Sequence, residues 1–122
     1  GGVTIIADAF ADDDKAVRLA ALKAVRRVNF FNKFDELIGA LGDDDGDVRK
    51  EASLLAGQYR VEDAVPVLAG ILRADKDTAA RRAAAWALGR IGGGDASAAL
   101  SAAKKSETDS TVRDAVDVAI QM

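Results

Sequence analysis

Residues 77–92, which read DTAARRAAAWALGRIG, carry the pattern that decides the fold of this 122-residue chain. The stretch opens with an Asp, which is followed three and four positions later by Ala and Arg. The same spacing, with Val in place of Ala, recurs in three other places, and these open at Asp14, Asp45 and Asp109. The intervals between the four Asp residues are 31, 32 and 32. A fixed period of this length is typical of stacked helix pairs. We therefore predict an all-α fold, an α-solenoid of four stacked helix pairs.

Recurring cap residues predict where the helices begin. An Asp or Asn at a helix start accepts hydrogen bonds from free backbone N–H groups and suits the positive end of the helix. After a short first helix in residues 4–10, the predicted starts are Asp14, Asn32, Asp45, Asp63, Asp77, Asp95 and Asp109. Asn29 stands where a left-handed residue is expected after the second helix. We assign residues 1–122 to a single domain with repeats at 3–28, 32–59, 63–92 and 95–122.

Small residues are expected to let neighbouring helices approach closely, and the third repeat supplies Ala83, Ala84 and Ala87 for this contact. The second predicted helix has an apolar stripe at helical spacing, formed by Val17, Ala20, Ala21, Ala24, Val25 and Val28. The last helix has one formed by Val112, Val116, Ala119 and Ile120. With no further helix beyond it, this last stripe predicts either self-association through the terminal helices or a longer native chain.

Composition excludes several classes of function. The chain has no Cys and no His, so it lacks thiolate ligands and both the commonest general base and the commonest metal ligand. We find no catalytic residues and no metal-binding or cofactor-binding residues, and we expect a protein that is not an enzyme and carries no cofactor. The net charge of −3 argues against nucleic acid as a partner. No apolar run is long enough for a membrane span and nothing resembles a secretion signal, so we expect a cytoplasmic protein.

The third repeat also shows a family resemblance. The segment from Ala80-Arg81 through Ala87-Leu88-Gly89 to Ile91-Gly92 resembles HEAT repeats, most closely the phycobilisome-lyase-like form of bacteria and archaea. Residues 63–68, DAVPVL, are similar to the first-helix signature of that form. The resemblance implies a helical superhelix whose second helices line the concave side, and it mostly implies protein binding. It also implies a few relatives that act in bilin attachment and a distant group that repairs DNA bases.

Two charged patterns receive structural interpretations. The repeated Asp and Arg are expected to cap helices and to pair with carboxylates or carbonyls of a neighbouring repeat, because a binding site seldom recurs in every repeat. The Asp-rich run at residues 43–47 fails the calcium-loop test, because the required Gly falls on Val48 and the closing Glu on Leu54. Clustered acids at one edge instead complement the helix dipoles.

The side chains that face away from the apolar stripes are the best candidates for binding a partner. They are Leu19, Leu22, Lys23, Arg26, Lys50, Leu54, Arg82, Trp86 and Arg90, and Phe31 joins them from a turn. A Trp flanked by Arg residues is typical of interaction hot spots. The alternatives are that Trp86 packs over the neighbouring repeat, and that Phe31 plugs the first turn.

We therefore expect a protein-binding scaffold or adaptor that uses the concave face of a HEAT-type solenoid, with an acidic peptide or helix as the partner. An accessory subunit of a bilin lyase, or of a similar modifying enzyme, is the alternative. A solenoid that binds nucleic acid ranks third.

Overall fold

A computed structural model describes residues 6–122, so the first two residues of the helix predicted at 4–10 lie outside the described part. Residues 6–8 are helical and lead into a 3-10 helix, η1 (Ala9–Ala11). The remaining elements are α2 (Lys15–Arg26), α3 (Phe34–Ala40), α4 (Gly46–Gln58), η2 (Glu62–Ala64), α5 (Val65–Ala74), α6 (Thr78–Ile91), α7 (Gly94–Ser106) and α8 (Ser110–Ile120). All of the secondary structure in residues 6–122 is helical, which confirms the predicted all-α class.

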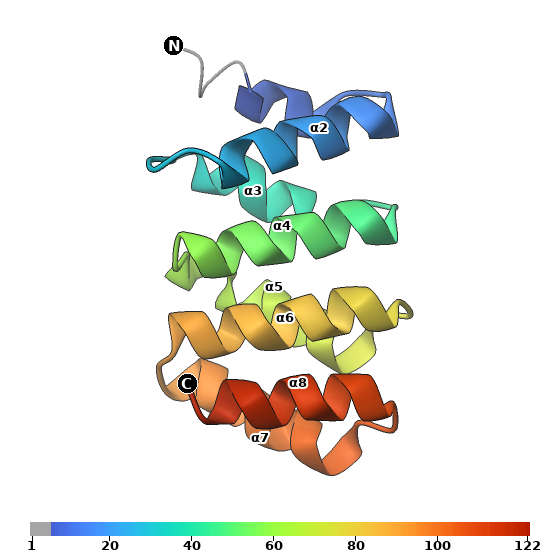
Figure 1. Cartoon of the computed structure of the whole chain (residues 1–122), viewed down its shortest axis with the longest axis vertical. Helices are drawn as coiled ribbons and strands as arrows, with labels where there is room; N and C mark the ends of the chain where they lie inside the picture. The colour runs from blue at the N-terminus through green and yellow to red at the C-terminus, as the bar shows by residue number, and fades with distance from the viewer. Residues whose placement is uncertain (1–5) are drawn as a thin grey trace.

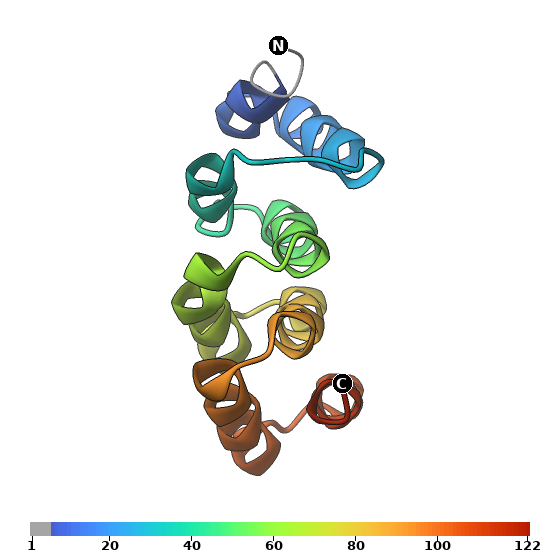
Figure 2. The same ribbon diagram turned by 90° about the vertical axis from the view of Figure 1, so that its left-hand side faces the viewer.

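The helices form two layers that follow the long axis of the molecule (Figures 1 and 2). One layer contains the first helices of the pairs, α3, α5 and α7, and the other contains the second helices, α2, α4, α6 and α8. Neighbouring second helices pack directly on one another, and each also packs on the first helix of its own pair. This arrangement confirms the predicted α-solenoid. Below, the outer surface of α2, α4, α6 and α8 is called the second-helix face.

The repeated Asp residues begin the second helices as predicted, but only three of them cap through the side chain. Asp14, Asp45 and Asp109 accept hydrogen bonds from the first backbone N–H groups of α2, α4 and α8. Asp77 occupies the same position before α6, yet its carboxylate accepts from Arg49 instead. An interaction between repeats thus replaces the local cap at this helix.

The predicted starts of the first helices are wrong by one or two residues. Lys33, not Asn32, precedes α3, and Asp63 lies in η2 before α5. Asp95 lies inside the first turn of α7, because Gly93 takes the cap position. None of the residues preceding these helices makes a side-chain cap hydrogen bond.

The left-handed residues also differ from the prediction for Asn29. Among residues 6–122, the only non-glycine residue with positive φ is Arg60, at 49°. Gly92 takes a φ of 74° at the end of α6, where a residue with a Cβ would be strained. The chain after α2 leaves the helix without a left-handed residue, so the prediction for Asn29 is wrong.

The core consists mainly of Ala, Leu and Val side chains that line both layers. Ala83, Ala84 and Ala87 are buried, which confirms their predicted place between helices. The stripe predicted for α2 is only partly covered, because Val17 and Val28 are 39% and 38% exposed. Their counterparts in the next repeat are Val48, which is buried, and Tyr59, which contacts the end of α2. Val28 lies just after α2, and among residues 6–122 no second helix precedes α2.

The stripe of α8 is more thoroughly covered than predicted. Val112, Val116 and Ala119 are buried against α6 and α7, and only Ile120 among the four predicted residues is exposed. The expected open apolar surface at this end is therefore smaller than the sequence suggested. No helix within residues 6–122 combines the length and the apolar character that a membrane crossing requires.

Candidate protein-binding surface

Trp86 lies in the middle of α6, and its side chain is partly buried. The ring lies over Gly57 of α4, so closely that a Cβ at position 57 would lie 2.6 Å from Trp86 Cζ3. The guanidinium of Arg90 lies 5.8 Å from the centroid of the indole ring, a cation–π contact. Trp86 therefore packs over the neighbouring repeat, as the alternative interpretation expected, and leaves part of its ring at the surface. Its role in binding a partner stays a prediction.

Arg82 lies one turn before Trp86 and is exposed. Its Nη1 donates a hydrogen bond to Thr111 Oγ1 of α8 at 2.9 Å. Thr111 is a neutral acceptor, so the charge of Arg82 is not neutralised by this contact. Arg82, Trp86 and Arg90 thus lie along one side of α6 on successive turns.

The candidate residues of α4 lie beside this group. Lys50 and Leu54 are half-buried, and Lys50 Nζ lies 3.9 Å from Glu51 Oε1. Glu51 is only 6% exposed, and its other oxygen lies 3.1 Å from Arg26 Nη1 of α2. Arg26 is therefore a bridge between the first two repeats, although its side chain also reaches the surface.

Two candidates do not belong to this surface. Leu22 is fully buried and belongs to the hydrophobic core instead of facing solvent. Phe31 is 3% exposed, and its ring centroid lies 5.9 Å from Phe10, 6.0 Å from Phe34 and 5.6 Å from Tyr59. The alternative interpretation of Phe31, a plug at the first turn, is the one that the structure supports. The exposed aromatic side chain in this turn is Phe30.

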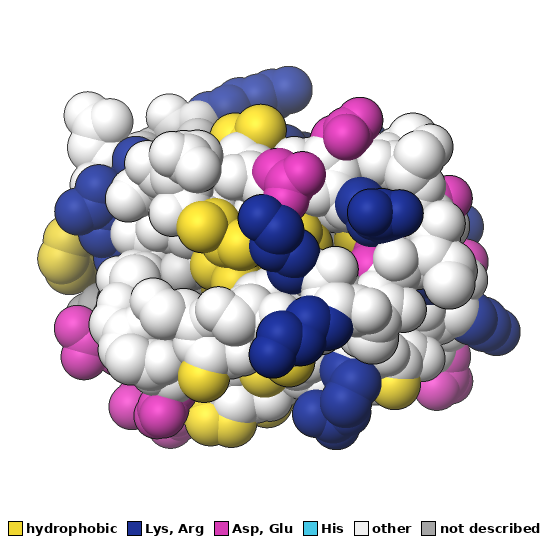
Figure 3. Space-filling model, turned by 90° about the horizontal axis from the view of Figure 1, so that it is seen from below, with side chains coloured by type: hydrophobic (Ala, Val, Ile, Leu, Met, Phe, Trp, Pro, Cys, Tyr) yellow, Lys and Arg dark blue, Asp and Glu magenta, His cyan; other side chains and the backbone are white. Residues whose placement is uncertain are grey.

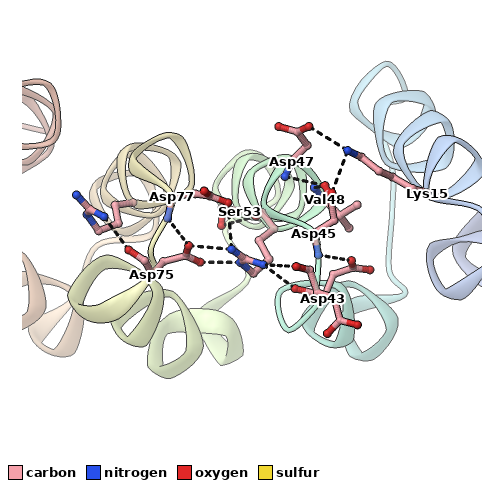
Figure 4. A network of polar contacts seen from close by, with 11 residues as sticks. Lys15, Asp43, Asp45, Asp47, Val48, Ser53, Asp75 and Asp77 are labelled. Carbon is pink, nitrogen blue, oxygen red and sulfur yellow. Dashed lines mark hydrogen bonds and ion pairs between the residues drawn. The ribbon is translucent and has the colours of Figure 1, made fainter.

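A ladder of ion pairs runs along the edge of the stack where the second helices begin. Its middle rung is drawn in Figure 4. We define the ladder by three rungs, Arg18–Asp43, Arg49–Asp75 and Arg81–Glu107, with closest N–O distances of 2.9, 2.7 and 3.0 Å. Each Arg comes from a second helix, and each acid precedes the second helix of the next repeat. These contacts confirm the predicted structural role for Arg18, Arg49 and Arg81. Arg113, the fourth repeated Arg, makes no such contact among the described residues.

Arg49 makes the most complete rung. Its Nε and Nη2 donate to both carboxylate oxygens of Asp75, at 2.7 and 2.9 Å, which is bidentate geometry. Its Nη1 donates to the carbonyl oxygens of Asp43 and Asp44 at 2.9 and 3.0 Å (Figure 4). Arg49 thereby joins the loop of its own repeat to the loop of the next one.

The same contacts shift the pKa values of the ladder acids. Burial acts to raise the pKa of Asp75, but the hydrogen bonds from Arg49 and from the Asp77 backbone N–H outweigh it, and the pKa lies below its usual value. Burial likewise acts to raise the pKa of Glu107. The hydrogen bonds from the Asp109 backbone N–H and from Arg81 outweigh it, so this pKa also lies below its usual value. Both carboxylates are therefore ionised at neutral pH, with their charges matched by Arg.

The Asp-rich run before α4 is paired with protein groups. Lys15 Nζ lies 2.9 Å from Asp45 Oδ2 and 3.4 Å from Asp47 Oδ2, and Arg18 pairs with Asp43 (Figure 4 shows the Lys15 contacts). Within residues 6–122, no group of three or more His, Cys, Asp or Glu side chains is arranged to hold a metal ion.

Sequence reasoning missed two residues that organise the second-helix face. Glu51 is a buried acid at a position that is Ala20, Ala83 and Ala115 in the other repeats, and that departure from the repeat was the available signal. The hydroxyl of Tyr59 lies 2.9 Å from the Val25 carbonyl oxygen and 2.7 Å from that of Val28, so it serves the end of α2. No pattern in the sequence pairs Tyr59 with that helix end.

Two layers of stacked helix pairs, tied by a repeating Arg–acid ladder, define the class of the protein as an α-solenoid. The chain belongs to the HEAT-repeat family, because the family profile described as HEAT repeats matches residues 34–121. A search of curated proteins found no match.

Among solved structures, human deoxyhypusine hydroxylase in complex with glycerol is similar, with a TM-score of 0.82 and 28% sequence identity. The alignment covers 98% of this chain and 42% of that one, so this chain spans less than half of the hydroxylase. That protein is an enzyme. The prediction that this chain is not an enzyme is therefore wrong on this comparison, because a stack of HEAT repeats does not itself indicate a protein without enzymatic activity.

Proposed function

We propose that this chain binds another protein through the second-helix face, at a site centred on Trp86 with Arg82 and Arg90 beside it. The observation that carries the proposal is the position of one partly exposed indole between two cationic side chains on successive turns of α6. The indole offers a wide apolar contact, and guanidinium groups offer forked donors to carboxylates. Lys23, Arg26 and Lys50 extend the cationic character along α2 and α4. An acidic peptide or helix is the partner that fits this chemistry.

Trp86 is the single Trp of the chain, so its fluorescence reports directly on this surface. The test titrates the protein with an acidic amphipathic helical peptide and, in parallel, with a peptide of the same length and apolar positions that carries Lys in place of Glu. We expect the emission of Trp86 to change with the acidic peptide only. The variant Arg82→Glu should weaken that binding by about tenfold. Lys76→Glu is the matched control, because it makes the same charge change on a loop away from this face.

A response to both peptides alike, or equal affinities of wild type and Arg82→Glu, would move the binding site away from Trp86. Circular dichroism of each variant establishes that the helices are intact before affinities are compared.

Within the HEAT family, we assign the repeats to the phycobilisome-lyase-like form on the motif at Ala80-Arg81 through Gly92 and on residues 63–68. The cytoplasmic location expected from the sequence stays a prediction.

A further inference from the structure

The ladder leaves an unpaired half-rung at each end of the stack. At the C-terminal end, Arg113 holds the position of Arg18, Arg49 and Arg81, and within residues 6–122 its guanidinium makes no hydrogen bond or ion pair. At the N-terminal end, Asp12 holds the position of Asp43 and Asp75, and no Lys or Arg of the described residues pairs with its carboxylate. One end therefore presents an unpaired cation and the other an unpaired anion.

Asp12 is held in the same way as the acids of complete rungs. Its Oδ1 accepts the backbone N–H of Asp14 at 2.9 Å. The equivalent hydrogen bonds, from Asp45 to Asp43 and from Asp77 to Asp75, are also 2.9 Å long. Arg18 Nη1 donates to the Asp12 carbonyl oxygen at 2.8 Å, as Arg49 does to Asp43. The Asp12 carboxylate is thus oriented as a rung acceptor although it lacks its Arg.

Apolar surface accompanies each half-rung. At the N-terminal end, Val17 of α2 and Val28, just after α2, are exposed. Their counterparts in the next repeat are the buried Val48 and Tyr59, whose hydroxyl contacts the end of α2. At the C-terminal end, Val118, Ile120 and Met122 are exposed. Figure 3 shows this end from below, with hydrophobic side chains gathered in its middle and charged side chains of both signs around them.

We propose that the C-terminal end of one copy stacks on the N-terminal end of a second copy, head to tail, and that Arg113 of the first pairs with Asp12 of the second. The partner is a second copy of this chain, because it supplies the missing acid in the geometry that the internal rungs use. Such a contact joins two different surfaces, so it continues from copy to copy rather than closing at a dimer. Complementary charge fixes its polarity and its register.

The side chains on the side of α8 that points away from α6 allow this contact. Gln121 occupies the position of Gly57 and Gly89, yet Arg26 occupies the same position in the first repeat, and α2 still stacks on α4. Asp117, at the position of Ala85, lies 3.6 Å from Lys104 Nζ, so its charge has a partner when the end is covered. The contact therefore resembles the α2–α4 interface more than the α4–α6 interface.

The test is sedimentation velocity of the 122-residue chain over a wide concentration range. We expect the average mass of the wild type to rise with concentration past that of a dimer. Arg113→Glu and Asp12→Arg should each weaken association by about tenfold, since each places like charges in the rung. Lys76→Glu, with the charge change of Arg113→Glu, should associate like the wild type.

Mixing the two weakened variants is the decisive arm. In an equimolar mixture, the introduced carboxylate of R113E faces the introduced guanidinium of D12R. At the other type of junction, the native Arg113 of the D12R variant faces the native Asp12 of the R113E variant, so association should return to the wild-type level. A misfolded variant could not restore it. A wild type that stays monomeric, a D12R variant that associates normally, or a mixture that stays as weak as its components would each overturn the proposal.

Discussion

The α4–α6 interface and the α2–α4 interface join neighbouring repeats in the same solenoid, yet their chemistry differs. At the α4–α6 interface, Gly57 lets the two backbones approach, and a Cβ there would lie 2.8 Å from Ala87 Cα. Ser53 and Ala85 at this level are fully buried. Contact between small side chains therefore stabilises this interface, supported at one edge by the bidentate Arg49–Asp75 pair.

At the α2–α4 interface, Arg26 stands where Gly57 stands in the next repeat, and a close approach is replaced by polar contacts. Arg26 pairs with the buried Glu51, and Gln58 Nε2 donates to the Arg26 carbonyl oxygen at 3.0 Å. The hydroxyl of Tyr59 lies within hydrogen-bonding distance of the carbonyl oxygens of Val25, in the last turn of α2, and of Val28, just after the helix. One repeat geometry can therefore be held either by close packing or by polar contacts between the helices, and the two interfaces differ in the residue at the Gly57 position.

The largest effect is expected from Asp75→Ala, which removes the acid of the α4–α6 rung. Its side chain is 5% exposed, so the variant leaves Arg49 without its charge partner in a poorly solvated position. Loss of one member of a buried ion pair costs about 3–5 kcal/mol in the free energy of unfolding. Asp12→Ala is the matched control, because Asp12 has the same backbone contact without an Arg, and it should cost below about 1 kcal/mol. Equal losses by urea unfolding would mean that the Arg contributes nothing to the rung.

Gly57→Ala should have the next largest effect. The added Cβ would lie within 3.0 Å of the Trp86 ring and of the Ala87 backbone, and the backbone cannot move aside cheaply. Overpacking of this kind costs about 1–3 kcal/mol. Gly70→Ala in α5 is the control, since its Cβ would meet only the Arg73 Nη2 at 3.9 Å. That control should gain about 0.5–1 kcal/mol from helix propensity. If both variants gain stability in thermal or urea unfolding, the α4–α6 interface is looser than the structure shows.

Tyr59→Phe tests the polar interface between α2 and α4. The variant keeps the ring among Phe31 and its neighbours and removes only the hydroxyl that serves the Val25 and Val28 carbonyls. We expect a loss of about 0.5–1.5 kcal/mol by urea unfolding. Hydrogen exchange of α2 should rise, while that of α6 stays unchanged. An unchanged α2 would show that water serves these carbonyls equally well.

The smallest effect is expected on the pH dependence of stability. The folded pKa values of Asp75 and Glu107 lie below their usual values, so these acids bind fewer protons in the folded state. They contribute stability that is complete above their unfolded pKa values of about 4, and that is lost as the pH falls through the lower folded values. Unfolding followed by circular dichroism should show a shallower acid limb for Asp75→Asn than for the wild type. Parallel limbs would contradict the role of the rung.

Much of the fold could be predicted from the sequence because its information is local and repeated. The Asp at each second-helix start and the Ala residues of α6 act within a turn or across one contact, so the period of 31 or 32 residues located them. The starts of the first helices were less accurate, because Asn32, Asp63 and Asp95 lie near those starts without capping them. A residue type suited to a cap does not fix where the backbone turns.

The candidate surface was predicted in part. Arg82, Trp86 and Arg90 share one side of α6, as their spacing of four residues requires. Leu22 and Phe31 were misplaced because their burial depends on contacts outside their own segment: Leu22 belongs to the shared hydrophobic core, and Phe10, Phe34 and Tyr59 surround Phe31. Periodicity within one helix does not show which partner lies against its second side.

By itself, the sequence determined the helical class, the period and the start of each second helix, since these follow from caps and side-chain spacing along a single helix. Only the tertiary structure decided which acid each Arg meets, that Glu51 is buried against Arg26, and that Gly57 lies under Trp86. Those contacts join residues 25 to 29 positions apart, and their geometry depends on how closely one helix pair stacks on the next.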